Sequence, residues 1–202
     1  MTYENQYMNG QTWPKLNILE ILRQRNPLVI CITNDVVRTF TANGLLAIGA
    51  SPVMSECSED LKDLIVHASA LLINIGTLTP DKVSYYKEAI ALAKKHGVPI
   101  VLDPVGCHAG AYRLSVVLDL LKTGAISLLR GNQSETKAIY DALSSDTKEA
   151  ASTLGKGVDG AQVADSAVTA YRLARLINCP VVATGEEDYV SDGTRVFAAP
   201  HG

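Results

Sequence analysis

The chain has 202 residues, which suits one sizeable α/β domain and is short for two. Hydrophobic residues make up 47% of it and charged residues 19%, so the composition indicates a globular protein rather than a disordered one. With a formal net charge of −3 and no basic stripe, it lacks the charge pattern of a nucleic-acid-binding protein. Its longest apolar run, residues 68–75, is too short to span a bilayer. We therefore expect a cytoplasmic protein that binds neither nucleic acid nor membrane.

The four cysteines lie far apart in the chain and form no Cys-x-x-Cys pair. This spacing argues against a structural zinc site or a redox dithiol, so we expect four reduced thiols. Of these, only Cys107 stands next to another reactive side chain, His108. Both follow Asp103 closely and are the two side chains that could act as a base near it.

Strand patterns and helix patterns alternate along the chain. Residues 1–15 read as a loose tail, and residues 16–202 as one α/β domain that is incomplete at its carboxyl end. We expect strands over residues 28–32, 52–54, 70–75, 99–102, 126–129 and 181–184. We expect helices over residues 39–48, from 58, over 80–96 and 113–121, from about 133, and over 163–177. A loop over residues 144–160 and a hairpin turn at residues 191–194 complete the prediction. The alternation predicts a mostly parallel sheet with helices on both faces.

Two helix starts have side chains that are typical of caps. Thr79 precedes Pro80, which predicts an N-cap followed by proline at the first helical position, and Gly97 should end that helix. Asn132 is followed three residues later by Glu135, a spacing that resembles a capping box.

Charged and polar residues follow several of the predicted strands. Asp103 closes one strand, Arg130 closes the next, Glu135 lies in the turn after it, and Thr184-Gly185-Glu186 follows the last. Because ligands of open α/β sheets bind at the carboxyl ends of the strands, we expect these side chains to converge at one edge. Carboxylates suit magnesium and the arginine fork suits phosphate, so the pattern predicts a magnesium-phosphate site. Each residue also has a structural explanation: Asp103 as a turn opener, Glu135 as a cap partner and Arg130 as a surface ion-pair partner.

The amino-acid sequences of several segments resemble those of the hydroxyethylthiazole kinases of thiamine salvage, which belong to the ribokinase-like group. The matches run in family order from about residue 27 to the end of the chain. They are residues 32–34 (Ile-Thr-Asn), 40–47 (Phe-Thr-Ala-Asn-Gly-Leu-Leu-Ala), 49–54 (Gly-Ala-Ser-Pro-Val-Met), 74–77 (Asn-Ile-Gly-Thr), 103–106 (Asp-Pro-Val-Gly), 130–132 (Arg-Gly-Asn), 156–159 (Lys-Gly-Val-Asp) and 184–186 (Thr-Gly-Glu). So many matches in order make the resemblance specific, although no single one would.

The resemblance implies a ribokinase-like fold and ATP-dependent phosphorylation of the hydroxyl of 4-methyl-5-(2-hydroxyethyl)thiazole. It implies a homotrimer with active sites between subunits. The residues that it assigns fall into three groups. Met54, with Asn34, Val36 and Gly76 as further candidates, would bind the thiazole; Arg130 and Thr184 would contact ATP; Asp103 and Glu135 would hold or orient Mg²⁺.

The sequence departs from the family pattern in two places. Ile30 and Cys31 stand where the family usually has a His and a small polar residue. The family's Thr-Gly-x-Gly-Cys-type motif, which carries the catalytic residue, would lie beyond Gly202, so no residue is assigned as catalytic. For the 202-residue chain we therefore expect at most trace turnover. The alternatives are a catalytically impaired protomer that binds thiazole or nucleotide, and another ribokinase-like enzyme such as a hydroxymethylpyrimidine kinase or a nicotinamide-nucleotide-hydrate dehydratase.

Overall fold

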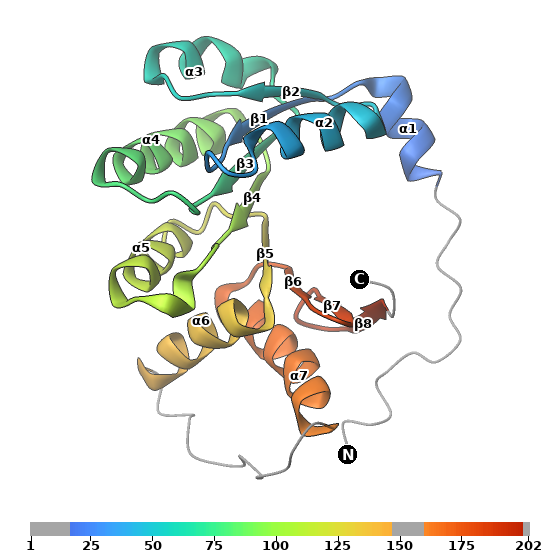
Figure 1. Ribbon diagram of the computed structural model, residues 1–202, viewed down its shortest axis with the longest axis vertical. Coiled ribbons are helices and arrows are strands. Elements are labelled where there is room, and N and C mark those ends of the chain that lie inside the picture. The colour runs from blue at the N-terminus through green and yellow to red at the C-terminus, as the bar shows by residue number, and fades with distance from the viewer. Residues whose placement is uncertain (1–16, 147–159, 200–202) are drawn as a thin grey trace. The chain divides into compact units, whose positions relative to one another are not determined.

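The computed structural model describes residues 17–146 and 160–199, and these residues group into two compact units (Figure 1). The amino-terminal unit comprises residues 17–103 with 125–127, and the carboxyl-terminal unit comprises the described residues of 104–124 and 128–199. The expected tail, residues 1–15, lies outside the described residues. That residues 16–202 form one domain stays a prediction, and each unit is described by itself.

The amino-terminal unit is built on four parallel strands in the order β2-β1-β3-β4. The strands are β1 (Leu28–Ile32), β2 (Ser51–Met54), β3 (Ala70–Asn74) and β4 (Ile100–Asp103). The helices are α1 (Ile18–Arg25), α2 (Arg38–Ile48), α3 (Ser58–Leu64) with a 3₁₀ turn over Ile65–His67, and α4 (Pro80–His96). Figure 1 shows α2 on one side of these strands and α3 and α4 on the other.

The core of this unit forms where α4 packs against the strands. Ile73 of β3 and Leu102 of β4 are fully buried, as is Ala89 of α4, and Tyr86 and Ile90 of the same helix are almost fully buried. The helix is delimited as the sequence predicts. The Thr79 hydroxyl accepts a hydrogen bond from the Lys82 amide at 3.2 Å, and Gly97 ends the helix with a left-handed φ of 69°.

Helices α1 and α2 have no buried residue, and several of their apolar side chains are exposed. Phe40 is 81% exposed and Ile18 is 61% exposed. Others on these two helices are also exposed: Leu19, Ile21, Leu46 and Ile48. These six exposed apolar side chains are together called the α1–α2 apolar surface.

The carboxyl-terminal unit contains a strand series in the order β5-β6-β7-β8. Strand β5 (Leu128–Asn132) runs parallel to β6 (Val181–Thr184), and β7 (Asp188–Ser191) and β8 (Val196–Ala199) continue the series antiparallel. The helices are a 3₁₀ turn over Cys107–Ala109, α5 (Ala111–Leu121), α6 (Gln133–Asp146) and α7 (Gly160–Ile177). The turn between β7 and β8 confirms the predicted hairpin.

The two faces of this strand series differ in burial. Leu129, Val181 and Ala183 are fully buried, and α7 packs against β6, β7 and β8. The residues that alternate with them point to the opposite face, where Arg130 is exposed and Val182 is half-buried. The face that carries Arg130 is therefore the more accessible one.

Most predicted elements differ from the structure by one to three residues at an end, and the differences at β5 and α6 have a clear physical reason. Strand β5 begins two residues later than expected and continues through Asn132, because Arg130 and Asn132 pair with Val182 and Thr184 of β6. Helix α6 extends to Asp146 and α7 begins at Gly160, so the loop predicted over residues 144–160 was wrong at residues 144–146 and 160; residues 147–159 lie outside the described part. Helix α1 was not predicted. None of the described helices combines the length and the apolar character that crossing a membrane requires.

Candidate functional site

Three polar side chains meet at the carboxyl ends of β1, β3 and β4 in the amino-terminal unit. Asn74 is the last residue of β3 and pairs in register with Asp103, the last residue of β4. The Asn74 side-chain amide donates to Asp103 Oδ2 at 2.6 Å. Its carbonyl oxygen accepts from Asn34 Nδ2 at 2.7 Å. Asn34 and Asn74 are each only 5% exposed, so these hydrogen bonds are shielded from water.

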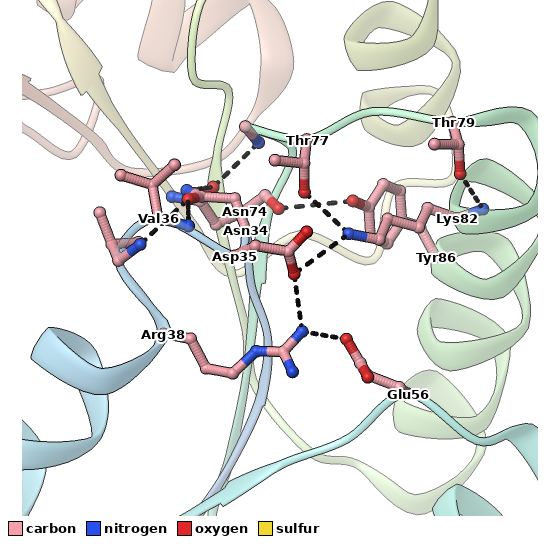
Figure 2. Close-up of polar contacts among 12 residues, drawn as sticks. Asn34, Asp35, Val36, Arg38, Glu56, Asn74, Thr77, Thr79, Lys82 and Tyr86 are labelled. Atoms are coloured by element: carbon pink, nitrogen blue, oxygen red, sulfur yellow. Dashed lines mark hydrogen bonds and ion pairs between the residues drawn. The ribbon is translucent and has the colours of Figure 1, made fainter.

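The Asn34 side chain also shapes the loop that follows β1. Its Oδ1 accepts hydrogen bonds from the backbone N–H groups of Val36 at 2.9 Å and Val37 at 3.1 Å (Figure 2). Gly76 lies against the other side of Asn34: a Cβ at Gly76 would stand 2.5 Å from Asn34 Nδ2. The Gly76 amide donates to Asn74 Oδ1 at 2.9 Å. A glycine at position 76 is therefore explained by packing against Asn34.

The remaining predicted thiazole residues lie at the same strand ends of this unit. Met54 ends β2, pairs in register with Cys31 of β1, and is half-buried. Val36 is 86% exposed, so its side chain is available for contact from outside the unit. The structure thus brings Met54, Asn34, Val36 and Gly76 to one edge of the strands, as parallel pairing requires.

A cluster of charged side chains borders this edge (Figure 2). Arg38, the first residue of α2, forms ion pairs with Asp35 at 2.8 Å and with Glu56. Lys82 of α4 donates to the Thr77 hydroxyl at 2.7 Å and lies 3.9 Å from Asp35. These contacts join the loops after β1, β2 and β3. Because the carboxylates are mostly exposed, we expect each ion pair to contribute only about 0–1 kcal/mol to stability.

In the carboxyl-terminal unit, Arg130 and Thr184 project from the same face of β5 and β6. Arg130 pairs in register with Val182, and Asn132 pairs with Thr184, so alternation places Arg130 and Thr184 together. The Thr184 hydroxyl donates to the Gly131 carbonyl at 3.4 Å. Among the described residues, no hydrogen bond or ion pair engages the Arg130 side chain, which is exposed. The prediction that Arg130 ends its strand was wrong, because Arg130 is the middle residue of β5.

Glu135 lies in the first turn of α6, where the sequence predicts it, and it closes the predicted capping box. Its Oε2 accepts from the Asn132 amide at 2.8 Å, and Asn132 Oδ1 accepts from the Glu135 amide at 2.9 Å. Its other oxygen, Oε1, accepts from the Gly106 amide at 2.8 Å. Glu135 is 5% exposed, so both oxygens of a buried carboxylate are held by backbone N–H groups.

The two side chains considered as bases differ in accessibility. Cys107 is buried, and burial together with the nearby Glu135 carboxylate raises the pKa of its thiol to about 12. Its Sγ donates to the Glu135 carbonyl at 3.6 Å. At neutral pH Cys107 therefore stays a thiol and cannot accept a proton readily. His108 is exposed.

The sequence analysis missed two residues of the amino-terminal edge. Asn74 is the central member of the hydrogen-bonded series Asn34–Asn74–Asp103, here called the polar chain, and the signal for it was an amide at the end of an otherwise apolar strand. Thr33 follows β1 directly, is 6% exposed, and its hydroxyl has no hydrogen-bond partner among the described residues. No pattern in the sequence indicates that the Thr33 hydroxyl would be buried in this way.

Comparison with known structures places the fold among the ribokinase-like kinases. A hydroxyethylthiazole kinase from Pyrococcus horikoshii superposes with a TM-score of 0.80 at 38% identity, over 93% of this chain and 66% of that chain. An adenosine kinase from Schistosoma mansoni superposes with a TM-score of 0.53 at 11% identity, over 91% of this chain and 63% of that chain, which shows the shared fold alone.

Sequence comparison identifies the family. Residues 19–202 match the sequence model of the Hydroxyethylthiazole kinase family. The chain is 54% identical over 173 residues to the hydroxyethylthiazole kinase of Streptococcus agalactiae serotype III (strain NEM316), covering 86% of this chain and 64% of that relative. The chain therefore belongs to the hydroxyethylthiazole kinase family, and it spans 64% of the length of this curated relative.

Proposed function

We propose that the protein acts in thiamine salvage, transferring the γ-phosphoryl group of ATP to the hydroxyl of 4-methyl-5-(2-hydroxyethyl)thiazole. The observation that carries the proposal is the gathering of the thiazole-site candidates at one strand edge in a chain of this family. Met54 would contact the ring from β2, and Val36 would contact it from the loop that Asn34 holds. The exposed apolar side chain of Val36 suits a heteroaromatic ring better than water.

ATP is the proposed phosphoryl donor, and Arg130 with Thr184 is the proposed contact for it. Arg130 offers five N–H donors on an accessible face, and a planar guanidinium matches phosphate oxygens with two parallel hydrogen bonds. Thr184 adds a hydroxyl on the same face of the neighbouring strand. Phosphoryl transfer depends mainly on positioning and on charge neutralisation, which these groups supply.

Mg²⁺ is the proposed cation, with Asp103 and Glu135 holding or orienting it. Carboxylate oxygens fit magnesium chemically, since it prefers hard oxygen ligands and keeps several waters. One Asp103 oxygen accepts from Asn74, and each Glu135 oxygen accepts one backbone N–H. Because Glu135 is buried and doubly held, its proposed role is to act through bound water rather than by direct coordination. The cation would supply charge neutralisation for the transferring phosphoryl group.

We further propose a cytoplasmic homotrimer. The α1–α2 apolar surface supports self-association, because Phe40 and Ile18 expose large apolar side chains that a partner subunit would remove from water. Burying such side chains contributes about 25 cal/mol for each Å² of apolar area. Sedimentation analysis of Phe40→Ser beside the unchanged protein tests the assembly: a trimer that persists unweakened would contradict this role for the surface.

The test of the kinase proposal is ATP- and thiazole-dependent release of ADP, measured on the protein at the length that its gene encodes. Arg130→Ala should weaken ATP binding by about 10- to 100-fold, the range expected for losing a hydrogen bond to a charged group. Thiazole binding should change little. Arg130→Lys should recover only part of the loss, because the ammonium cannot form the two-pronged contact.

Arg195→Ala is the matched control, since Arg195 is an exposed arginine of the same unit that pairs with Asp192 in the β7–β8 turn. It removes the same charge without touching the face of Arg130. If Arg130→Ala and Arg195→Ala weaken ATP equally, the nucleotide role of Arg130 is wrong. If the unchanged protein releases no ADP with thiazole present, the proposed activity is wrong.

A further inference from the structure

We propose that Asn74 is a positioning residue that couples the loop over residues 34–37 to the Asp103 carboxylate. The two ends of this connection are a proposed thiazole contact and a proposed magnesium contact, so the inference rests on the proposed function. Asn74 contacts neither ligand in this proposal. It acts by fixing, through hydrogen bonds, where the Asp103 carboxylate and the Asn34 side chain stand.

In the hydrogen-bonded series from Asn34 through Asn74 to Asp103, every donor points towards Asp103. An ionised Asp103 can only accept, so the Asn74 side chain must turn its NH₂ group towards Asp103. The Asn74 oxygen then faces Asn34 and the Gly76 amide, which are both donors. Asn34 in turn must present its NH₂ group to Asn74, which leaves its oxygen for backbone amides. The charge of one carboxylate therefore fixes the orientation of two side-chain amides.

At the end opposite Asp103, the hydrogen-bonded series reaches the loop after β1. Asn34 Oδ1 accepts from the Val36 and Val37 amides, so the loop conformation depends on the orientation that Asn74 gives to Asn34 (Figure 2). Asn34 cannot move away freely, because Gly76 packs against it with no room for a Cβ. Buried hydrogen bonds of this kind polarise one another, and losing one member leaves others without a partner.

The consequence for the reaction is that two parts of the proposed site are set by one side chain. A displaced loop would loosen Asn34, and through Asn74 it would weaken one of the hydrogen bonds that position the Asp103 carboxylate. Rigid support of this kind is what keeps a site near its productive geometry. Asn74 would therefore affect turnover through Asp103 and thiazole binding through Asn34.

The first experiment does not depend on turnover. Hydrogen–deuterium exchange is followed at the Val36 and Val37 amides in the unchanged protein, in Asn74→Leu, and in Asn74→Ser should the leucine variant fail to fold. Loss of the link should speed exchange of both amides by about 3- to 10-fold, which corresponds to one hydrogen bond. Ser127→Ala is the control, because the Ser127 hydroxyl accepts from the Ile100 amide at the opposite end of β4. Equal exchange at Val36 and Val37 in the Asn74 variants and in the control would overturn the coupling.

The second experiment is a double-mutant cycle on turnover with Asn74→Leu and Asp103→Asn. If Asn74 acts through Asp103, Asn74→Leu should lower kcat by about 10- to 100-fold in the unchanged background and by less than about 3-fold beside Asp103→Asn. A merely structural role predicts that the two losses multiply, and that result would overturn the inference. Absence of turnover in the unchanged protein would instead overturn the proposed function, and the exchange experiment would then decide the coupling alone.

Discussion

The two units each use one polar side chain to hold two backbone N–H groups, but they use different chemistry. In the amino-terminal unit, Asn34 holds the Val36 and Val37 amides. In the carboxyl-terminal unit, Glu135 holds the Gly106 and Asn132 amides. Asn34 also donates to Asn74, so its hydrogen bonds continue to a further side chain. The Glu135 carboxylate only accepts, so the series of hydrogen bonds ends there.

This difference indicates what each arrangement can do. A side-chain amide both donates and accepts, and it can pass an orientation from a loop to a distant carboxylate. A buried carboxylate must be compensated by donors, and once two N–H groups compensate it, its main effect is to fix the backbone around it. The amino-terminal edge is thus arranged to connect groups, whereas Glu135 is arranged to hold the start of α6. Arg130 differs from both, because its side chain is exposed on β5 and no hydrogen bond among the described residues holds it.

The largest effect should come from removing the Glu135 carboxylate. Glu135→Ala leaves the Gly106 and Asn132 amides without an acceptor, at about 1–3 kcal/mol each, so we expect a loss of about 2–6 kcal/mol in the free energy of unfolding. Glu135→Gln keeps one carbonyl oxygen for two N–H donors, so it should lose about half as much. Denaturant titration measures both.

The control for Glu135 is Thr79→Ala, which removes an exposed helix cap from the amino-terminal unit. It should cost about 0.5–2 kcal/mol. If Glu135→Ala costs no more than Thr79→Ala, the two amides have other partners and the compensation described for the buried carboxylate is wrong. If Glu135→Gln keeps both stability and turnover, Glu135 serves only as the capping partner of Asn132.

The next largest effect should come from Gly76→Ala in the amino-terminal unit. The new Cβ would stand within 2.5–2.8 Å of three Asn34 side-chain atoms, so Asn34 must shift. Overpacking of this kind costs about 1–3 kcal/mol, and thiazole binding should weaken with it. Gly44→Ala in α2 is the matched control: its Cβ would meet nothing within 4 Å, and alanine should stabilise the helix by about 0.5–1 kcal/mol. Equal stabilities of the two variants would show that Gly76 does not confine Asn34.

Much of the fold and the family could be predicted from the sequence because the signals are local. Val29 to Ile32 and Val181 to Ala183 are continuous apolar runs, and both became buried or half-buried strand positions. Thr79 with Pro80, and Asn132 with Glu135, are cap spacings that the structure confirms. Strand β5 was placed too early because Ile126 adds an apolar residue before Leu128 and Leu129, whereas pairing with β6 decides where the strand lies.

The connections within the site could not be predicted, because they depend on contacts between distant segments. Asn34 and Asn74 are 40 residues apart, and no spacing in the sequence indicates that their side chains meet. Gly76 was assigned to the thiazole from the family resemblance, and only the position of Asn34 shows a packing reason for it. The roles of Met54, Arg130, Thr184, Asp103 and Glu135 towards ligands stay predictions.

The thiols offer a smaller test that spans both units through their pKa values. Burial raises the pKa of Cys31 and of Cys179 to about 11, and burial with the nearby Glu135 charge raises that of Cys107 to about 12. In the unfolded chain a thiol has a pKa of about 8.5. Below that pH the thiols are protonated in both the folded and the unfolded protein, so their contribution to the free energy of unfolding is fully present. As pH rises from about 8.5 to 11 the unfolded chain loses protons first, and stability falls.

Thermal unfolding at pH 7.0, 8.5 and 9.5 measures this decline, and a thiol reagent added to the folded protein at pH 7.5 provides a second reading. Cys57 is the exposed cysteine and should react at once, whereas Cys31, Cys107 and Cys179 should react only on unfolding. A melting temperature that holds steady up to pH 9.5, or rapid reaction of all four thiols, would show that these three side chains are not shielded from water.

The smallest expected effect is at Thr33, beside the polar chain of the amino-terminal unit. Its hydroxyl is buried and has no partner among the described residues, whereas the neighbouring Asn34 side-chain amide both donates and accepts hydrogen bonds. Thr33→Val replaces the hydroxyl with a methyl group of the same shape, which removes an unsatisfied polar atom, so we expect a gain of at most about 1 kcal/mol in the free energy of unfolding. A loss of stability instead would mean that the Thr33 hydroxyl does make a hydrogen bond. Loss of thiazole binding at unchanged stability would place that hydroxyl in the site, and the polar chain would then extend one residue further towards β1.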